Sequence, residues 1–493
     1  MKRIILLISL IFTTCLFSQT QIGQDIEGEA ANDKSGYSIS LSADGSILAI
    51  GARNNGGNGL NSGHVRVYQN ESGNWLQIGQ DIDGENVGDN FGQSVSISAN
   101  GQVLAISAQF NDGNGSPSSN IGHVRVFEFI SNNWIQIGVD IEGEAILDQS
   151  GYSISLSNDG NLIAIGARFN DGNSGDSGHV RVYENQSGNW IQVGQDIDGE
   201  ASGDQSGYAI SLSSNGSFVA VGAPFNDGNS GDSGHVRVYE NQSGNWIQVG
   251  QDIDGEAEAD GFGSSVSLSS DGSILAIGAP SNDGNGNISG HVRVFENVND
   301  VWVQIGQDID GEDSTNQSGV AVSLSSDGSI VAIGAINNSD NGANSGHVRI
   351  YKNQNGTWNQ IGNDIDGESG SDLSGFSVSL SSDGSIVAIG AINNDGNGSN
   401  SGHVRVFDLS AVLSSDSFNL DLYKIITDNN LQELQITLNP NTILKQVNLY
   451  TIDGKYLYSL NQNVISTNNL SSGVYIVEVE TNKGKSAKKV VVN

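Results

Sequence analysis

Residues 207–256 read GYAISLSSNGSFVAVGAPFNDGNSGDSGHVRVYENQSGNWIQVGQDIDGE, and near-copies of this stretch fill most of the chain. Four short segments within it are typical of β-strands, and we expect them over 208–212, 218–221, 235–239 and 246–249. The first alternates apolar and small residues, whereas the second is a continuous apolar run that suits a strand buried on both faces. The unit therefore predicts a sheet of four antiparallel strands.

The histidines show the period of the repeat, because their spacings are 59 residues once and then 56 residues five times. Each lies in a G-H-V-R-[VI]-[YF] run, so that an arginine follows it two positions later. One sheet cannot bury both of its faces, but seven sheets packed around an axis can. We therefore predict an all-β fold with a seven-bladed β-propeller over residues 19–407. The repeated pairs are His64 and Arg66, His123 and Arg125, His179 and Arg181, His235 and Arg237, His291 and Arg293, His347 and Arg349, and His403 and Arg405.

Two features of the repeat predict how strands connect and how the ring closes. An Asp-Gly or Asn-Gly pair separates the first two strands in every unit, which favours a type I′ turn. Six fourth strands contain a tryptophan, but the seventh unit ends at Phe407 without one. Residues 19–25 read QTQIGQD, the tail of that missing strand. We expect Gln19–Asp25 to supply the outer strand of blade seven and to remove an exposed sheet edge.

Charge and composition exclude several classes of function. The chain has 493 residues and a formal net charge of −36, from 56 acidic and 20 basic residues. Such a chain repels phosphate backbones, so we expect no nucleic-acid partner. The single cysteine, Cys15, leaves the rest of the chain with no disulfide and no thiolate nucleophile.

The N-terminus has the layout of a secretory signal peptide over residues 1–18. Lys2 and Arg3 precede an apolar run over 4–17, and Ser18 offers a small residue for cleavage. A short buried helix and a lipoprotein signal that uses Cys15 are the alternatives. No later apolar run is long enough to suggest a transmembrane segment.

The composition changes after residue 407, where the repeat stops. Residues 408–418 have the character of a linker, and residues 419–493 contain alternating segments that we expect to form strands over 434–438, 446–452, 456–460, 473–480 and 486–492. This pattern predicts a small antiparallel β-sandwich as a separate C-terminal domain.

The repeated units resemble the FG-GAP repeat, the blade of the integrin alpha-chain propeller. Phe91-Gly92 and Phe262-Gly263 match its first element, and Gly222-Ala223-Pro224 and Gly278-Ala279-Pro280 match its second. The resemblance implies extracellular recognition or adhesion rather than catalysis. Members of this family often bind calcium in a D-x-D-x-D-G loop between the first two strands. Here that loop is reduced to the Asx-Gly turn, so no residue is assigned to that site.

The C-terminal residues resemble the type A sorting domain of type IX secretion. The resemblance rests on Val447-Asn448-Leu449-Tyr450, Asp453-Gly454-Lys455, Leu470, Ser472-Gly473-Val474-Tyr475 and Lys488-Lys489-Val490-Val491. It implies export across the outer membrane of a Bacteroidetes-type cell by the type IX machinery, through residues 419–493. The domain would then be cleaved or used for surface attachment. The alternative is an ordinary β-sandwich binding module.

Acidic loops are the candidate metal sites. Antiparallel topology brings the loops between strands two and three and the D-I-[DE]-G-E loops between blades to one face. Hard oxygen ligands on glycine-rich loops suit Ca²⁺, but Asp and Asn also cap turns by bonding to their own backbone, and both interpretations stay open. The candidate calcium ligands are Asp171, Asn173, Asp176, Asp227, Asn229, Asp232, Asp283, Asn285, Asp395 and Asn397.

We interpret the repeated arginines and histidines as structural residues. An arginine in the middle of a strand suits a buried ion pair with a carboxylate of the neighbouring blade. The histidines of adjacent blades are too far apart to share one metal ion. The tryptophans stand at blade spacing, which favours packing between blades over a sugar-binding platform.

These patterns together favour a secreted or cell-surface, non-catalytic protein that binds an extracellular protein or polysaccharide through the acidic loop face. We expect a monomer. A polysaccharide-binding protein is the first alternative. A secreted degradative enzyme, a glycosidase or a lyase, is the second, because carboxylate pairs are present in every unit.

Overall fold

A computed structural model describes residues 19–113, 118–414, 423–428, 432–438, 442–452, 455–481 and 484–492, so that the expected signal peptide lies outside the described residues. A boundary between Leu413 and Ser414 divides the chain into two compact units. Among the described residues, all regular elements are strands apart from one short helix, α1 (Ser410–Ser414). The C-terminal unit is a separate body, and each unit is considered by itself below.

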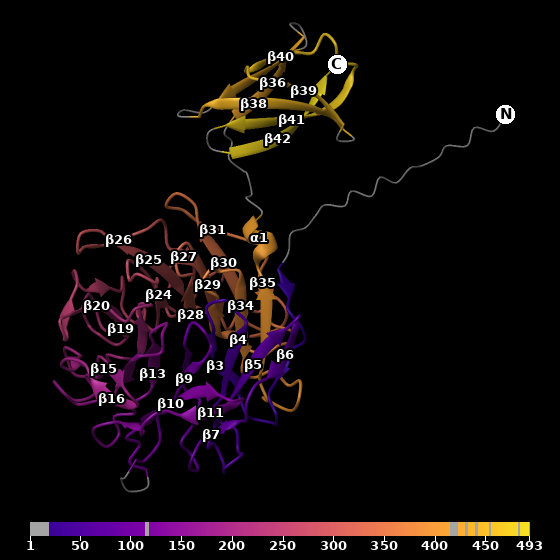
Figure 1. Cartoon of the computed structure of the whole chain (residues 1–493). Coiled ribbons are helices and arrows are strands. Elements are labelled where there is room, and N and C mark those ends of the chain that lie inside the picture. Colours follow the sequence, from indigo (N-terminus) through magenta and orange to yellow (C-terminus); the bar gives the residue numbers. More distant parts are fainter. Residues whose placement is uncertain are drawn as a thin grey trace. The chain divides into compact units, whose positions relative to one another are not determined.

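The N-terminal unit is a ring of seven antiparallel sheets, which confirms the predicted β-propeller (Figure 1). In each blade, four strands follow one another from the axis outward, and a short additional strand pairs with the third. The innermost strands are β3 (Ser35–Leu41), β8 (Val95–Ile97), β13 (Ser153–Leu156), β18 (Ala209–Leu212), β23 (Ser265–Leu268), β28 (Ser318–Leu324) and β33 (Ser374–Leu380). The second strands are β4 (Ile47–Ala52), β9 (Val103–Ala108), β14 (Leu162–Ala167), β19 (Phe218–Ala223), β24 (Ile274–Ala279), β29 (Ile330–Ala335) and β34 (Ile386–Ala391).

The third strands carry the repeated His and Arg, and the outer strands carry the tryptophans. The third strands are β5 (His64–Glu71), β10 (His123–Ile130), β15 (His179–Gln186), β20 (His235–Gln242), β25 (His291–Asn297), β30 (His347–Asn353) and β35 (His403–Asp408). The outer strands of blades one to six are β6 (Asn74–Gln77), β11 (Asn133–Gln136), β16 (Asn189–Gln192), β21 (Asn245–Gln248), β26 (Trp302–Gln304) and β31 (Trp358–Gln360). The short fifth strands are β7 (Ile82–Asp83), β12 (Ile141–Glu142), β17 (Ile197–Asp198), β22 (Ile253–Asp254), β27 (Ile309–Asp310) and β32 (Ile365–Asp366).

Apolar second strands form the core between adjacent blades. In blade four, Val219 and Ala220 are fully buried, and they face neighbouring blades on opposite sides of the sheet. Val219 belongs to a cluster with residues of blade three, whereas Ala220 belongs to a cluster with residues of blade five. A strand that contacts apolar neighbours on both faces has no polar face, which explains its continuous apolar sequence.

Serines on the first strands join the blades in a closed ring. In every blade, the backbone N–H of the last apolar residue of the first strand donates to a serine hydroxyl of the preceding blade, with N···O distances of 2.9–3.1 Å. A small hydroxyl side chain fits the crowded axis and satisfies a half-buried amide. The donor–acceptor pairs are Leu41–Ser379, Ile97–Ser40, Leu156–Ser96, Leu212–Ser155, Leu268–Ser211, Leu324–Ser267 and Leu380–Ser323.

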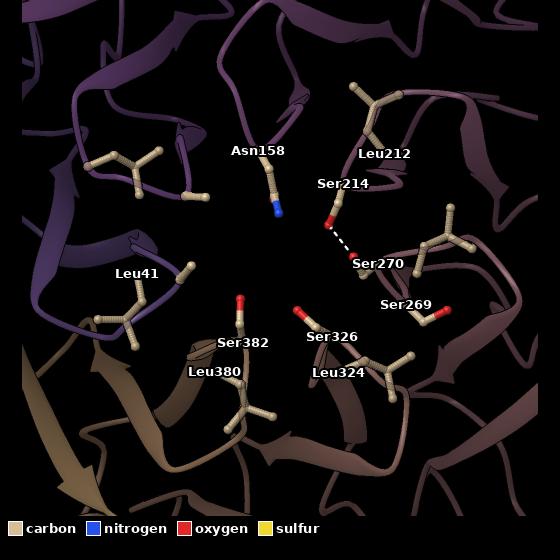
Figure 2. A pocket seen from close by; sticks show the side chains of 14 residues that line it. Leu41, Asn158, Leu212, Ser214, Ser269, Ser270, Leu324, Ser326, Leu380 and Ser382 are labelled. Carbon is tan, nitrogen blue, oxygen red and sulfur yellow. Dashed lines mark hydrogen bonds between the residues drawn. The ribbon is translucent and has the colours of Figure 1, made fainter.

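A second ring, made of backbone hydrogen bonds alone, lies at the end of the axis that carries the Asx-Gly turns (Figure 2). Each amide donates to the carbonyl of the equivalent residue in the next blade, over 2.8–2.9 Å, and the seventh returns to the first. Leucines and serines line a pocket of about 150 Å³ here, in which Ser270 donates to Ser214. The ring residues are Ala43, Ala99, Asn158, Ser214, Ser270, Ser326 and Ser382.

The tryptophans attach each of blades one to six to the preceding blade, as the packing interpretation expected. Each of the six indole Nε1–H groups donates to a backbone carbonyl of the preceding blade, at 2.9–3.2 Å. The side chains are buried except for the half-buried Trp190. A buried indole needs such an acceptor, which explains their regular spacing.

The N-terminal residues close the ring as predicted. β1 (Thr20–Gln21) pairs with β35 as the outer strand of blade seven, with Gln21 opposite Phe407. The N–H of Ile22 donates to the carbonyl of Val406 at 2.7 Å. β2 (Ile26–Glu27) pairs with the start of β35 and takes the place of the short fifth strand. The first and last parts of the propeller sequence thus form one sheet.

The predicted type I′ turn is wrong. Gly45 has a φ of 69°, but Asp44 is not among the residues with positive φ. The Gly45 N–H donates to the carbonyl of Ser42 at 2.9 Å, and the Asp44 carboxylate accepts from the N–H of Ser46. The geometry is a type I turn followed by a left-handed glycine, in which the Asp side chain caps the next amide.

The expected linker begins as ordered structure. Leu409 and Val412 are buried in an apolar cluster with blades six and seven, and α1 starts between them. The C-terminal unit has the two sheets of the predicted sandwich: β36 (Tyr423–Asp428), β37 (Glu433–Leu438) and β40 (Val464–Ser466) in one, and β39 (Tyr456–Leu460), β38 (Leu444–Thr451), β41 (Gly473–Thr481) and β42 (Gly484–Val492) in the other. Both sheets contribute to a single core cluster.

Candidate functional site

The propeller has a wide hollow around its axis on the face that carries the loops between strands two and three and between blades, here named the loop face. The hollow has a volume of about 550 Å³ and is named the axial cup. Its lining residues are Tyr37, Gln93, Tyr152, Tyr208, Pro224, Phe225, Asp232, Ala259, Gly261, Ser264, Pro280, Ser281, Gln317, Val320, Ile336 and Phe376. A concave site of this size, lined by both aromatic and polar side chains, is typical of ligand binding.

Aromatic rings form two adjacent pairs in the wall of the cup. Tyr37 and Phe376 lie with ring centroids 4.9 Å apart, and Tyr152 and Tyr208 do the same. Phe225 extends the second pair, in an edge-on arrangement 6.1 Å from Tyr208. All five rings are at least partly exposed, so they offer apolar faces to a ligand.

Two arginines stack on these rings. The Arg53 guanidinium lies 3.7 Å from the centroid of Tyr37, and the Arg168 guanidinium lies 3.8 Å from that of Tyr152. Arg53 also donates to Gln93, which accepts from Gln109 as well. Cation–π contacts of this kind contribute about 0.5–2 kcal/mol each and hold the rings in place. Burial raises the pKa of the Tyr152 hydroxyl, so the phenol stays neutral and can donate a hydrogen bond.

Apart from Asp232, a candidate calcium ligand, and Pro224 and Pro280 of the FG-GAP motifs, the cup residues were not singled out from the sequence, although a signal is present. The position after the Ser-Gly or Phe-Gly pair at the first strand is aromatic in four units, but polar or aliphatic in the other three. The third position of the Gly-Ala-x segment also varies, being Arg, Gln, Pro or Ile. Because the units are otherwise similar, the variation at these two positions shows where the sevenfold symmetry is broken. Both positions face the axis.

The candidate calcium residues lie on the loop face, in hydrogen bonds of their own loops. The Asp171 carboxylate accepts from the N–H of Asp176, and the Asn173 amide donates to the carbonyl of Gly199 in the inter-blade loop. Equivalent bonds are made by Asp227, Asn229, Asp283, Asn285, Asp395 and Asn397. Asp232 occupies the position of Asp176 and also lines the cup. Calcium binding by these loops stays a prediction.

The repeated arginines lie at the seams between blades. The Arg237 guanidinium donates to the backbone carbonyl of Asp198 at 2.9 Å and lies 3.3 Å from the Glu200 carboxylate, both in the loop that precedes its own blade. The other six arginines make the corresponding ion pair with Glu29, Glu85, Glu144, Glu256, Glu312 and Glu368. Arg181 also binds Asp196 through two hydrogen bonds.

The histidines lie beside these pairs and are almost fully buried. Burial, and then the adjacent arginine, lowers the pKa of each to about 4, so the imidazoles are neutral at neutral pH. His179 Nδ1 lies 3.9 Å from Glu144 and 3.8 Å from Asp196. Clusters of one histidine and two carboxylates recur around the ring, and the cluster of blade six has a third carboxylate.

Family models match two parts of the chain. Residues 253–295 match the FG-GAP repeat, and residues 430–493 match the secretion system C-terminal sorting domain. The chain is therefore a β-propeller protein with FG-GAP repeats and a type IX sorting domain. It is secreted or displayed on the cell surface in Bacteroidetes. No helix in the described part of the chain is long and apolar enough to cross a membrane.

The chain is also similar in part to a solved structure. A crystal structure assigned to a 6-phosphogluconolactonase from Bacteroides uniformis aligns with a TM-score of 0.47 and 13% sequence identity, over 67% of this chain and 85% of that one. No curated protein matches the chain.

Proposed function

We propose that this protein is a non-catalytic binding protein, which recognises an extracellular partner through the loop face of its propeller. Its sorting domain places it outside the cell, and FG-GAP repeats suggest a binding role. The observation that carries the proposal is the axial cup. It is the place where aromatic and arginine side chains break the repeat, whereas the seams between blades repeat one arrangement.

The cup, rather than the acidic loops alone, gives the loop face its specificity in this proposal. The acidic loops have similar sequences in all seven units. A partner would therefore meet similar carboxylates at every blade. The two aromatic pairs belong to blades seven and one and to blades three and four, so they define an orientation around the axis. Binding energy in such interfaces concentrates on a few aromatic and arginine anchors.

The experiment is a binding screen of the full mature chain against surface proteins and polysaccharides, with and without calcium. The substitution Tyr152→Ala together with Tyr208→Ala removes one aromatic pair and should weaken binding at least about tenfold. Leu76→Ala is the matched control, because Leu76 is exposed on outer strand β6. An equal loss of affinity in the Leu76→Ala control, or an unchanged affinity in the double variant, would refute a role for the cup in binding.

Polysaccharide binding is the second candidate, and the exposed aromatic rings favour it. Rings that line a hollow can stack against the apolar faces of sugars, and Gln93 and Ser264 add hydrogen-bonding groups. Binding on a glycan array without turnover would support this candidate. Release of shorter products from a polymer would instead show a degradative enzyme and contradict the non-catalytic proposal.

A further inference from the structure

Blade six differs from the other blades in the loop between β29 and β30. The other six units have a glycine at the third position of this loop, as in Asn170-Asp171-Gly172-Asn173, whereas blade six has Asp340 there. The flanking residues keep their roles: the Asn341 amide donates to Gly367 as Asn173 does to Gly199, both at 2.8 Å. Blade six also has Ser339 at the position of Asp171, so the carboxylate of this loop is shifted by one position rather than added.

This carboxylate joins three other groups that can bind a metal ion. One donor atom from each of Glu312, Asp340, His347 and Asp364 lies within 4.8 Å of all the others. His347 Nδ1 is 3.7 Å from Asp364 and 4.0 Å from Glu312. None of the ten candidate calcium residues belongs to this cluster.

His347 is the buried polar group of the cluster that has no partner. Its side chain is 0% exposed, and neither ring nitrogen has a hydrogen-bond partner among the described residues. A buried nitrogen without a partner has lost its hydrogen bonds to water and forms none within the protein, which is unfavourable in free energy. Within the described part of the chain, the Nδ1 atom of His347 therefore lies without a hydrogen bond between the Asp364 and Glu312 carboxylates.

The charges of the cluster are not balanced within the protein. Three carboxylates face one guanidinium, that of Arg349, which lies 3.6 Å from Glu312. The excess of two negative charges equals the charge of one divalent cation. In blade seven, His403 lies beside two carboxylates, Asp25 and Glu368, and the buried Asp372 accepts from the Asn394 amide outside that cluster, whereas blade six has Asn316 at the position of Asp372.

We propose that blade six binds a divalent transition-metal ion through His347, Asp340, Glu312 and Asp364. Donor atoms about 2.0–2.2 Å from one Zn²⁺ ion lie roughly 3–4 Å apart, close to the separations found here. The imidazole indicates Zn²⁺ or a similar ion rather than Ca²⁺ or Mg²⁺, which prefer oxygen ligands alone. Because Glu312 belongs to the loop between blades five and six, the ion joins two blades and stabilises their seam.

The test uses the full mature chain, treated with a chelator and desalted, in buffer of about 0.15 M ionic strength to screen non-specific attraction to the acidic surface. Zn²⁺ is added in the presence of excess Ca²⁺, and metal content, affinity and melting temperature are measured. We expect about one Zn²⁺ per chain and a higher melting temperature. Co²⁺ in place of Zn²⁺ should give visible absorption that reports nitrogen and oxygen ligation.

Asp340→Gly is the decisive variant because it installs the residue that the other six blades carry, so it should fold. It should weaken Zn²⁺ binding at least about tenfold, and His347→Gln should do the same. His235→Gln is the matched control, since His235 lies beside Glu200 and Asp252 but its blade has Gly228 at the position of Asp340. Circular dichroism checks the fold of each variant.

Three results would overturn the proposal. These are unchanged affinity in a folded Asp340→Gly variant, uptake of about seven ions per chain, and complete displacement of Zn²⁺ by Ca²⁺, which would indicate an adventitious ion only. Loss of binding in His235→Gln alone would place the ion in blade four instead. If His347→Gln does not fold, the Asp340→Gly result decides.

Discussion

The seven buried histidines should make the propeller sensitive to mild acid. In the folded protein each has a pKa of about 4, whereas an unfolded histidine titrates near its model value of 6.5. The unfolded chain therefore binds more protons between these values. Stability is fully present above about pH 6.5 and decreases as the pH falls toward 4.

The magnitude follows from the difference in pKa. At one pH unit below the unfolded pKa, each histidine favours the unfolded state by a factor of about ten, or about 1.4 kcal/mol. Seven such residues would amount to about 10 kcal/mol, comparable with the whole stability of a typical domain. Buried carboxylates oppose this effect, because burial raises the pKa of Asp198, Asp254 and others, and the folded state gains protons there. We therefore expect a net loss of several kcal/mol between pH 7.5 and pH 5.5.

Urea denaturation of the full chain at these two pH values measures the effect. His235→Gln should lower the pH dependence by roughly one seventh, because it removes one of seven equivalent groups. An outer-strand control, Ile247→Ala at an exposed position of β21, should leave the dependence unchanged. A free energy of unfolding that is equal at pH 7.5 and pH 5.5 would show that the histidines are not buried in the neutral state, and would refute the reasoning.

Four further predictions concern the ring and its loops. Ser323→Ala removes the acceptor of the Leu380 amide and should cost about 1–3 kcal/mol in urea denaturation, unlike the exposed Ser243→Ala. Trp246→Phe removes an indole N–H that donates to the preceding blade at 2.9 Å and should cost about 1–3 kcal/mol, with a lower melting temperature. Ile22→Pro removes the N–H that bonds to Val406 and should lower the melting temperature and increase proteolysis at the closing strand; unchanged protection would contradict closure by this segment. If the loops around Asp171 and Asp227 bind calcium, the melting temperature should rise with calcium relative to chelator, whereas equal temperatures would exclude that prediction.

The repeated pattern made the fold predictable, because seven copies of one alternation leave few alternatives. The closing strand over 19–25 was predictable as well, since its residues continue the pattern that Phe407 leaves unfinished. The turn at Asp44-Gly45 was predicted wrongly because an Asx-Gly pair fits two kinds of turn. Distinguishing them requires the strand register, which the pair itself does not encode.

The cup was not predicted, for a different physical reason. Tyr37 and Phe376 lie 339 positions apart in the chain and meet only because the ring closes. Likewise, Asp340 is one unremarkable acid among many until the fold places it beside His347. Comparison of what the sequence repeats share reveals the scaffold. The residues that distinguish one blade from another become apparent only when the units are superimposed in the structure.

The ring of backbone hydrogen bonds from Ala43 to Ser382 also restricts how many repeats the chain can contain. Near-identical stretches of coding sequence recombine readily, and losing or gaining one would preserve the reading frame and every local pattern. The resulting protein would nevertheless contain a circle of six or eight members, in which each bond must accommodate a different angle between neighbours. The ring therefore constrains the number of copies as a whole, while single blades remain free to diverge at the axial cup.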